Sequence, residues 1–87
     1  MRMSISPDVL RAHVSGEAVL LNLADKNYYG LNETSAAVWA GLERGETPDK
    51  ILSTLLEQYD ISESEAAKRI DDVIGDFRER KLIVDSL

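Results

Sequence analysis

Residues 27–39 have the sequence NYYGLNETSAAVW, in which a strand pattern gives way to a helix pattern within a few residues. The adjacent aromatic residues Tyr28 and Tyr29 favour a β-strand, which we expect over residues 27–31. Asn32 is of a residue type that ends strands and caps helices, because its side chain accepts a hydrogen bond from a free amide of the next turn. The segment therefore predicts a short strand followed directly by a helix.

Three helices are predicted after Asn32. In the first helix, helical spacing relates four residues: Ser35, Val38, Trp39 and Leu42. Gly45 provides its stop signal. The second begins with Thr47 as cap and Pro48 at the first helical position, and its apolar stripe consists of Ile51, Leu52, Leu55, Leu56 and Tyr59. The third begins at the capping-box sequence of residues 62–65, reaches about Arg80, and has its apolar face at Ala66, Ile70, Val73, Ile74 and Phe77.

Two further apolar runs precede the Tyr28 strand. They cover residues 9–14 and 18–23, and Ser15-Gly16 between them favours a tight turn. We expect a three-stranded antiparallel meander whose last strand has an open edge. Leu82-Ile83-Val84 fits either a short last strand or a docked tail, and the sequence leaves both open. The predicted fold is α+β and winged-helix-like, with a three-stranded antiparallel sheet followed by a three-helix bundle in one domain, residues 1–87.

Composition limits the classes of function. The 87 residues contain no cysteine, which excludes thiolate catalysis, disulfides and Cys-ligated metal. No apolar run has the length of a signal peptide or a membrane span, so we expect a cytoplasmic protein without a membrane partner. The 10 basic and 16 acidic residues give a net charge of −6, which disfavours a nucleic-acid partner.

The side chains offer little for catalysis or cofactor binding. His13 is the only histidine, and nucleophilic or metal chemistry would need partners beside it. The glycines form no phosphate-binding loop, and the carboxylates of the third helix alternate with basic residues as on a solvated face. We therefore expect neither an enzyme nor a bound cofactor or metal.

The predicted fold suggests two kinds of binding protein. Winged-helix domains often bind DNA, but the third helix has five basic residues against six acidic ones, so an acidic transcriptional regulator is the weaker reading. An open strand edge beside a long helix is also a receptor for an extended peptide that adds as a strand. The residues favour peptide binding.

Two segments resemble a known family. LLNL at residues 20–23 and YYGLNETSAAVW at residues 28–39 are similar to the PqqD-like family of precursor-recognition domains. The chain most resembles the stand-alone leader-binding proteins of lasso-peptide biosynthesis. The resemblance continues through Gly45, Thr47, the Ile51 helix and the segment from Phe77 to Leu82, and covers roughly residues 17–84.

The resemblance implies a non-catalytic adaptor. Such a protein binds the leader segment of a ribosomally made precursor peptide as a fourth strand, and delivers it to a maturation enzyme such as a leader protease. A peptide chaperone of the pyrroloquinoline-quinone type, or of another modified-peptide pathway, is the alternative. Two copies of the chain are also expected to be able to pair through the open edge of the third strand.

By position, the resemblance places leader binding between the third strand and the third helix. The expected strand residues are Asn27, Tyr28, Tyr29 and Gly30. The facing stripe, inferred from helical spacing one step from the core stripe, consists of Ala67, Asp71, Ile74, Gly75 and Arg78. Many relatives have glycine where this chain has Lys26 and Lys81, so the sequence leaves open the geometry of the turn before the tyrosines and of the third helix's end.

Overall fold

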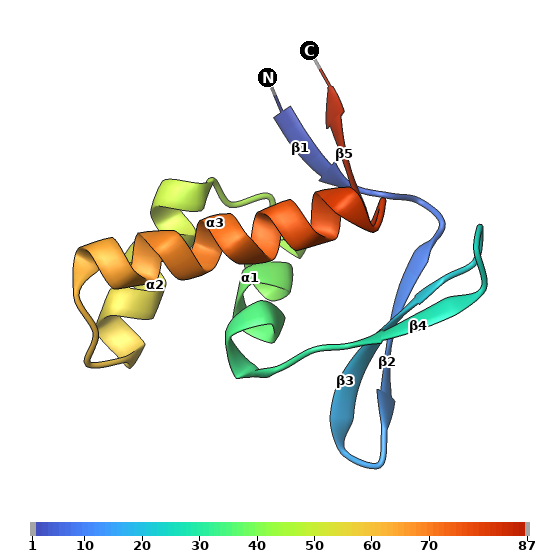
Figure 1. Cartoon of the computed structure of the whole chain (residues 1–87), viewed down its shortest axis with the longest axis horizontal. Coiled ribbons are helices and arrows are strands. Elements are labelled where there is room, and N and C mark those ends of the chain that lie inside the picture. Colours follow the sequence, from blue (N-terminus) through green and yellow to red (C-terminus); the bar gives the residue numbers. More distant parts are fainter. Residues whose placement is uncertain (1, 87) are drawn as a thin grey trace.

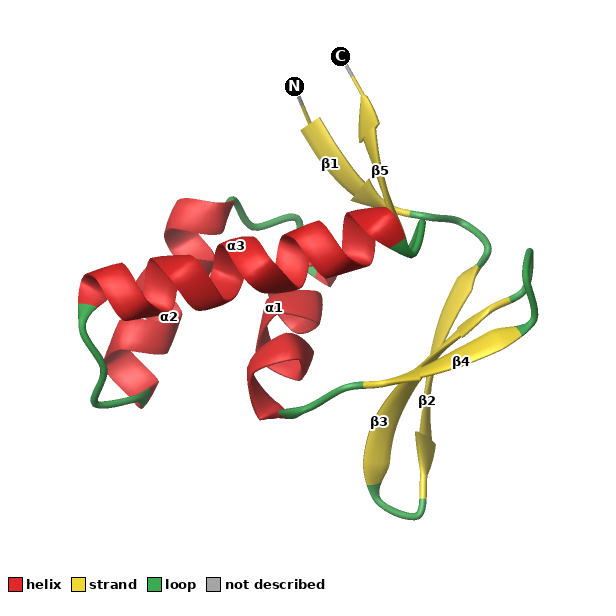
Figure 2. Ribbon diagram, in the orientation of Figure 1, coloured by secondary structure: helices red, strands yellow, loops and turns green. Residues whose placement is uncertain are grey.

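The structure is a computed structural model that describes residues 2–86 (Figure 1). The elements follow in the order β1 (Arg2–Ile5), β2 (Val9–Val14), β3 (Glu17–Asn22), β4 (Asn27–Gly30), α1 (Glu33–Glu43), α2 (Pro48–Gln58), α3 (Glu63–Glu79) and β5 (Ile83–Ser86). The helices lie together on one side, and the three-stranded sheet lies beyond the C-terminal end of α3 (Figure 2).

The larger sheet has the order β2-β3-β4 and is antiparallel throughout. Its first hairpin turns at Ser15 and Gly16, whose φ angles of 53° and 83° suit a two-residue hairpin loop. In the register, Leu20 lies opposite Arg11 on one side and Tyr29 on the other. The α+β fold with three antiparallel strands and three helices is therefore confirmed, and the predicted boundaries of these strands differ from the structure by at most one residue.

A second, two-stranded sheet is an addition to the predicted fold. β1 pairs antiparallel with β5, with Ile5 opposite Ile83, and the two strands lie side by side near the chain termini (Figure 1). The last strand left open by the sequence is thus formed. β1 was not predicted, because its partner is at the far end of the chain and no local turn signal marks the pairing.

The three helices begin where the capping residues predict. The side chains of Asn32, Thr47 and Ser62 accept hydrogen bonds from the amides of Ser35, Lys50 and Glu65, at 2.8, 3.3 and 3.1 Å. These bonds satisfy amides that have no partner within the helix. Each helix start is therefore specified by its own sequence.

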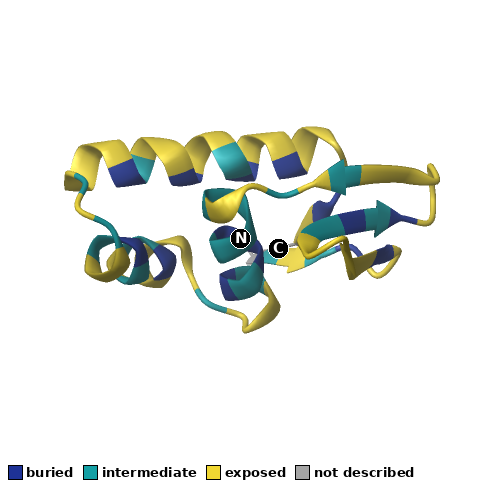
Figure 3. Ribbon diagram, turned by 90° about the horizontal axis from the view of Figure 1, so that it is seen from below, coloured by how far each residue is buried: buried dark blue, intermediate teal, exposed yellow. Residues whose placement is uncertain are grey.

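The core lies between the helices and extends to the inner face of the larger sheet. Trp39 is 1% exposed and meets Phe77 edge-to-face, with ring centroids 5.3 Å apart. The buried residues of α3 lie on its side facing α1 and α2 (Figure 3). Leu20 joins this core from β3, so the sheet is attached to the helices through apolar contacts.

Besides the Ser15-Gly16 turn, three lysine or glycine positions adopt left-handed backbone conformations. α1 and α3 end in the same Schellman geometry, with Gly45 at φ 75° and Lys81 at φ 60° just after their caps. In α3 the amide of Leu82 donates to the carbonyl of Phe77 at 2.9 Å, and that of Lys81 to Arg78 at 3.1 Å. Lys26, in the β3–β4 turn, has φ 62°. Both lysines keep the left-handed conformation that glycine adopts easily.

Candidate functional site

A groove lies between β4 and the C-terminal half of α3. It has a volume of about 220 Å³ and is lined by Tyr28, Tyr29, Gly30, Leu31, Ser35, Asp76, Phe77, Arg80 and Leu82. The half-buried Tyr29 and Leu31 supply apolar surface above the buried Phe77 and Leu82, and Asp76 and Arg80 supply charge. The groove therefore combines a strand edge with a mixed apolar and charged helix surface.

β4 presents an open edge at this groove, because among the described residues its only sheet partner is β3. The amide of Leu31 donates to the carbonyl of Ala18 at 3.0 Å, so these two residues form a hydrogen-bonded pair of the ladder. Hydrogen-bonded pairs alternate with non-bonded pairs in an antiparallel ladder. The backbone groups of Tyr28 and Gly30 therefore point away from β3, towards the open edge.

Arg80 connects α3 to β4 across the groove. Its Nε donates to Asp76 Oδ1 at 2.9 Å, and its guanidinium carbon lies 5.0 Å from the centroid of the Tyr29 ring, a cation–π distance. The hydrogen bond with Asp76 raises the pKa of Arg80 above its usual value. The guanidinium therefore remains charged over the Tyr29 ring.

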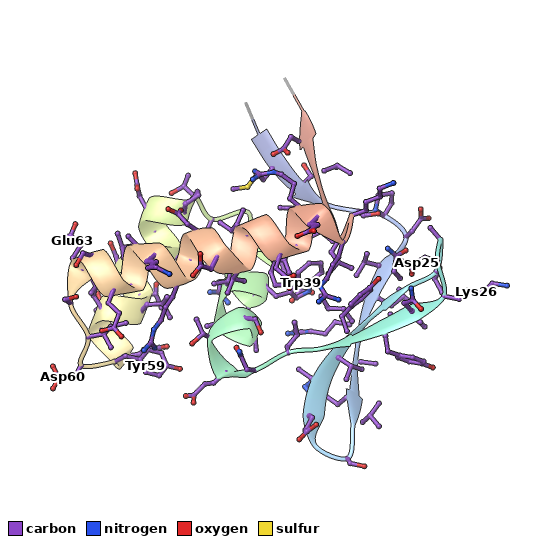
Figure 4. All side chains as sticks on the ribbon, viewed as in Figure 1. Asp25, Lys26, Trp39, Tyr59, Asp60 and Glu63 are labelled. Atoms are coloured by element: carbon purple, nitrogen blue, oxygen red, sulfur yellow. The ribbon has the colours of Figure 1, made fainter. Side chains whose placement is uncertain are left out.

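The β3–β4 turn supports Tyr29 from the other side. The Tyr29 hydroxyl donates to Asp25 Oδ2 at 2.9 Å, and the amide of Asn27 donates to Asp25 Oδ1 at 2.9 Å. The backbone bond from Asn27 first, and the Tyr29 hydroxyl next, lower the pKa of Asp25 despite some desolvation. Asp25 lies beside Lys26 at the tip of this turn (Figure 4). The turn thus holds the Tyr29 ring under Arg80.

The two tyrosines point to opposite sides of the sheet, as their adjacent positions predict. Tyr29 is half-buried against the core, whereas Tyr28 is 68% exposed. Asn27 and Gly30 are exposed, and a Cβ at Gly30 would meet no atom within 4 Å. Three of the four expected strand residues line the groove, and Asn27, the first residue of β4, is not among its lining residues.

The structure places the five expected helix residues away from the lining of this groove. Ile74 is 6% exposed and belongs to the core, and Arg78 forms a two-bond ion pair with Asp85, at 2.8 and 3.1 Å, on the β5 side of α3. Ala67 is half-buried, while Asp71 and Gly75 are exposed. Of the described residues, none of these five lines the groove. Leader binding by Ala67, Asp71, Ile74, Gly75 and Arg78 therefore stays a prediction, and this groove is lined by a different row of α3.

The physical reason is the rotation of about 100° per residue along a helix. Two rows flank the core stripe of α3, and spacing does not tell which of them faces β4. The row that does so contains Asp76 and Arg80, both missed from the sequence. The sequence held only a partial signal for this row. Arg80 is an arginine near the end of the predicted third helix, and an aromatic strand was expected beside that helix.

A larger depression of about 830 Å³ lies on the other side of α3, between β1 and the α1–α2 connection. Arg78 and Asp85 line it together with Met3, Glu43 and Glu46. Arg78 is already bonded to Asp85 there, and the depression contains no open strand edge of the larger sheet. The smaller groove is therefore the candidate site.

Metal binding and membrane insertion are two other roles to weigh for residues 2–86. Within that range no group of three His, Cys, Asp or Glu side chains is placed to hold a metal ion. No helix of the described chain is long and apolar enough to cross a membrane. The groove beside β4 is the feature on which we build the function.

The fold and groove define a winged-helix-like α+β domain with an open strand edge above a helix. The family described as "Coenzyme PQQ synthesis protein D (PqqD)" matches residues 17–83, and the chain belongs to this family. The matched range includes β4, the groove and all of α3.

Two solved structures share this fold. One is described as "TbiB1 in Complex with the TbiA(beta) Leader Peptide"; it is 26% identical, has a TM-score of 0.88, and the match covers 97% of this chain and 98% of that one. The other, "Lasso peptide synthetase B1 complexed with the leader peptide", is 21% identical with a TM-score of 0.89, covering 98% of this chain and 100% of that one. A comparison with curated proteins finds no match.

Proposed function

We propose that this protein binds the leader segment of a ribosomally made precursor peptide in the groove between β4 and α3. The observation that carries the proposal is the open edge of β4 beside a groove with apolar and charged walls. Strand addition to an open edge takes its affinity from main-chain hydrogen bonds and its specificity from side-chain pockets. The family and the two leader-peptide complexes of the same fold support this assignment.

The leader would form a fourth strand. Its backbone would bond the outward amide and carbonyl groups of Tyr28 and Gly30, the two residues left free by the β3–β4 ladder. Alternate leader side chains would then enter the groove and meet its half-buried residues Tyr29 and Leu31, and Arg80. Asn27, Tyr28, Tyr29 and Gly30 therefore stay in the proposed site, and the helix row that contains Asp76 and Arg80 replaces the expected stripe.

The protein would act by presentation and not by catalysis. It would hold the precursor by its leader and deliver it to a separate maturation enzyme, for a lasso peptide a leader protease, in the cytoplasm. In the absence of peptide the same edge of β4 would pair two copies of the chain. Leader binding would then compete with this pairing, because both use the backbone of Tyr28 and Gly30.

The test is fluorescence anisotropy of a labelled leader peptide from the precursor encoded beside this protein. We expect saturable binding of the leader, and none of the core peptide or of a DNA duplex. Salt-sensitive binding of the duplex without leader binding would contradict the proposal and favour the transcriptional regulator.

A matched pair of arginine variants locates the site. Arg80→Ala removes a charged wall of the groove and is expected to weaken leader binding about tenfold, since arginines at such positions contribute strongly to binding. Arg78→Ala removes the same side chain two residues away, on the β5 side, and is expected to leave the affinity within about twofold. The opposite ranking would place the leader on the other side of α3.

A further inference from the structure

The two-stranded sheet lies apart from the larger sheet and has an open edge of its own (Figure 2). Within the described part of the chain, β1 pairs only with β5. The amide of Ser6 donates to the carbonyl of Leu82 at 3.0 Å, so these residues form a hydrogen-bonded pair at the end of the ladder. Because bonded and non-bonded pairs alternate, the backbone groups of Met3 and Ile5 point away from β5. Over residues 2–86, neither residue makes a backbone hydrogen bond to another element.

This edge borders the depression of about 830 Å³ between β1 and the α1–α2 connection. The consecutive β1 residues Met3, Ser4 and Ile5 all line it. Leu42 and Pro48 line it from the end of α1 and the start of α2. Met3, Ile5 and Leu42 are only half-buried, so the depression offers accessible apolar surface beside free backbone groups. An open strand edge next to such a hollow is a receptor for an extended peptide.

The charged residues that line the depression are mostly acidic. Glu43, Glu46 and Asp85 lie there together with Arg78. Arg11 approaches Glu43 through one contact, at 3.2 Å to Oε1, and the two side chains are 44% and 35% exposed. Exposed ion pairs of this kind are weak, so the Glu43 carboxylate is available to a cation from a partner. The charge of the depression therefore favours a basic ligand.

We propose that this depression binds an extended, basic segment of a partner protein, which adds to β1 as a strand. The main chain of the segment bonds the outward groups of Met3 and Ile5. Its side chains on the depression side include an apolar residue against Leu42 and a lysine or arginine near Glu43. The segment lies between β1 and the α1–α2 connection and leaves the bonds of Arg78 intact. The site is separate from the groove beside β4, and the inference does not depend on the proposed function.

A second copy of the chain fits this edge less well than a basic partner does. Two copies paired through β1 would bring two sets of the same acidic residues together, and like charges across paired strands are destabilising. Each copy also has a net charge of −6, which adds repulsion between them. A basic segment is attracted by the same charges. Charge complementarity therefore selects the basic partner.

The experiment titrates two short peptides into the isotope-labelled full chain and follows its backbone amides by NMR. One peptide alternates lysine with valine, and the other alternates glutamate with valine. We expect the lysine peptide to shift the amides of Met3 and Ile5 and to leave those of Tyr28 and Gly30 unchanged. The glutamate peptide is expected to bind at least about tenfold more weakly, because it has the charge of the depression.

Three variants test the charge and the backbone edge. Glu43→Lys reverses a charge in the depression and is expected to weaken binding of the lysine peptide about tenfold. Glu57→Lys makes the same change at an exposed position of α2 outside the depression, and should keep the affinity within about twofold. Met3→Pro removes an outward amide without removing a bond to β5, and should weaken binding about fivefold. Circular dichroism identifies a variant that fails to fold, and Glu43→Lys and Met3→Pro replace each other in that case.

The location of the shifts and the ranking of the variants decide the inference. Absence of shifts at Met3 and Ile5, or shifts at Tyr28 and Gly30 in their place, would overturn it. Equal weakening by Glu43→Lys and Glu57→Lys would also overturn it, because net charge alone would then explain the binding. Shifts at Met3 and Ile5 that depend on protein concentration without peptide would overturn it in favour of a second copy. Failure of the leader peptide to bind would instead overturn the proposed function and leave this inference standing.

Discussion

The two sides of α3 carry the same chemistry with different consequences. On the β5 side, Arg78 bonds both carboxylate oxygens of Asp85 and ties the helix to the last strand. On the β4 side, Arg80 bonds Asp76 of its own helix and lies over the Tyr29 ring. The first arginine joins two elements by directed hydrogen bonds, whereas the second touches its strand only through a ring face. The β4 side is therefore the one that a peptide strand can enter without breaking a hydrogen bond between elements.

The difference between the two sides of α3 can be tested at Gly75. This residue was expected to line the groove and lies exposed in the middle of the helix. A Cβ at this position meets no atom within 4 Å, so Gly75→Ala is expected to stabilise the protein by about 1 kcal/mol through helix propensity. In a domain of this size that raises the Tm by roughly 4–8 °C, which calorimetry measures. Leader affinity should not change.

Gly45→Ala is the matched control, because Gly45 also has open space around it but has φ 75°. The same substitution there is expected to destabilise the protein by about 1 kcal/mol, since alanine is strained in the left-handed region. If Gly75→Ala instead weakens leader binding and leaves the Tm unchanged, the leader contacts the exposed side of α3 and the assignment of its two sides is wrong.

The end of α3 offers a second, smaller effect. Lys81 has φ 60° in a Schellman motif that directs Leu82 into the core beneath the groove and β5 away from it. A left-handed non-glycine residue costs about 1–2 kcal/mol, and glycine loses part of this gain through its freer unfolded chain. Lys81→Gly is therefore expected to stabilise the protein by about 0.5–1 kcal/mol in urea unfolding.

Lys81→Ala separates backbone strain from charge, because it keeps the Cβ and removes the ammonium group. We expect it to have nearly the stability of the unaltered chain. Equal stabilisation by alanine and glycine would mean that repulsion among the basic residues at this helix end is the cause, and not the left-handed backbone.

Local signals allowed most of the fold to be predicted. The caps at Asn32, Thr47 and Ser62 each act within three residues, and the Ser15-Gly16 turn joins adjacent strands. The pairing of β1 with β5 could not be predicted in this way, because it joins residues about 80 positions apart. Non-local pairing leaves no mark in a local sequence pattern.

The candidate site could be predicted only on its strand side. Side chains along a strand alternate between two faces. One face of this sheet packs on the core, so Tyr29 points inward and Tyr28 points outward. A helix has rows on both flanks of its core stripe, and the choice between them depends on how α3 crosses the sheet. The predicted row contains Arg78, two residues before Arg80. Two residues correspond to about 200° of rotation around the helix, so the two rows lie on different flanks of α3.

The smallest expected effect is the pH dependence of the ion pair on the β5 side of α3. Its bond to Arg78 holds the pKa of Asp85 below the ordinary value of 3.8. A carboxyl whose pKa is lower in the folded state stabilises the fold above its unfolded pKa, and this contribution disappears as the pH falls through the folded pKa. Because the Arg78 and Asp85 side chains are 47% and 27% exposed, solvent screens the pair, and the loss should be small and confined to the pairing of β5 with α3.

Carboxyl-carbon NMR titration measures this directly. Arg78→Gln is expected to return the pKa of Asp85 to its ordinary range, while Arg80→Gln should leave it lowered, because Arg80 bonds Asp76 on the other side of the helix. Amide exchange in β5 should rise at acidic pH in the unaltered protein and at neutral pH in Arg78→Gln. An Asp85 that titrates at its ordinary pKa in the unaltered chain would show that Arg78 is not committed to β5 in solution. Arg78 would then be as free as Arg80 to contact a peptide, and the difference between the two sides of α3 would rest on the open edge of β4 alone.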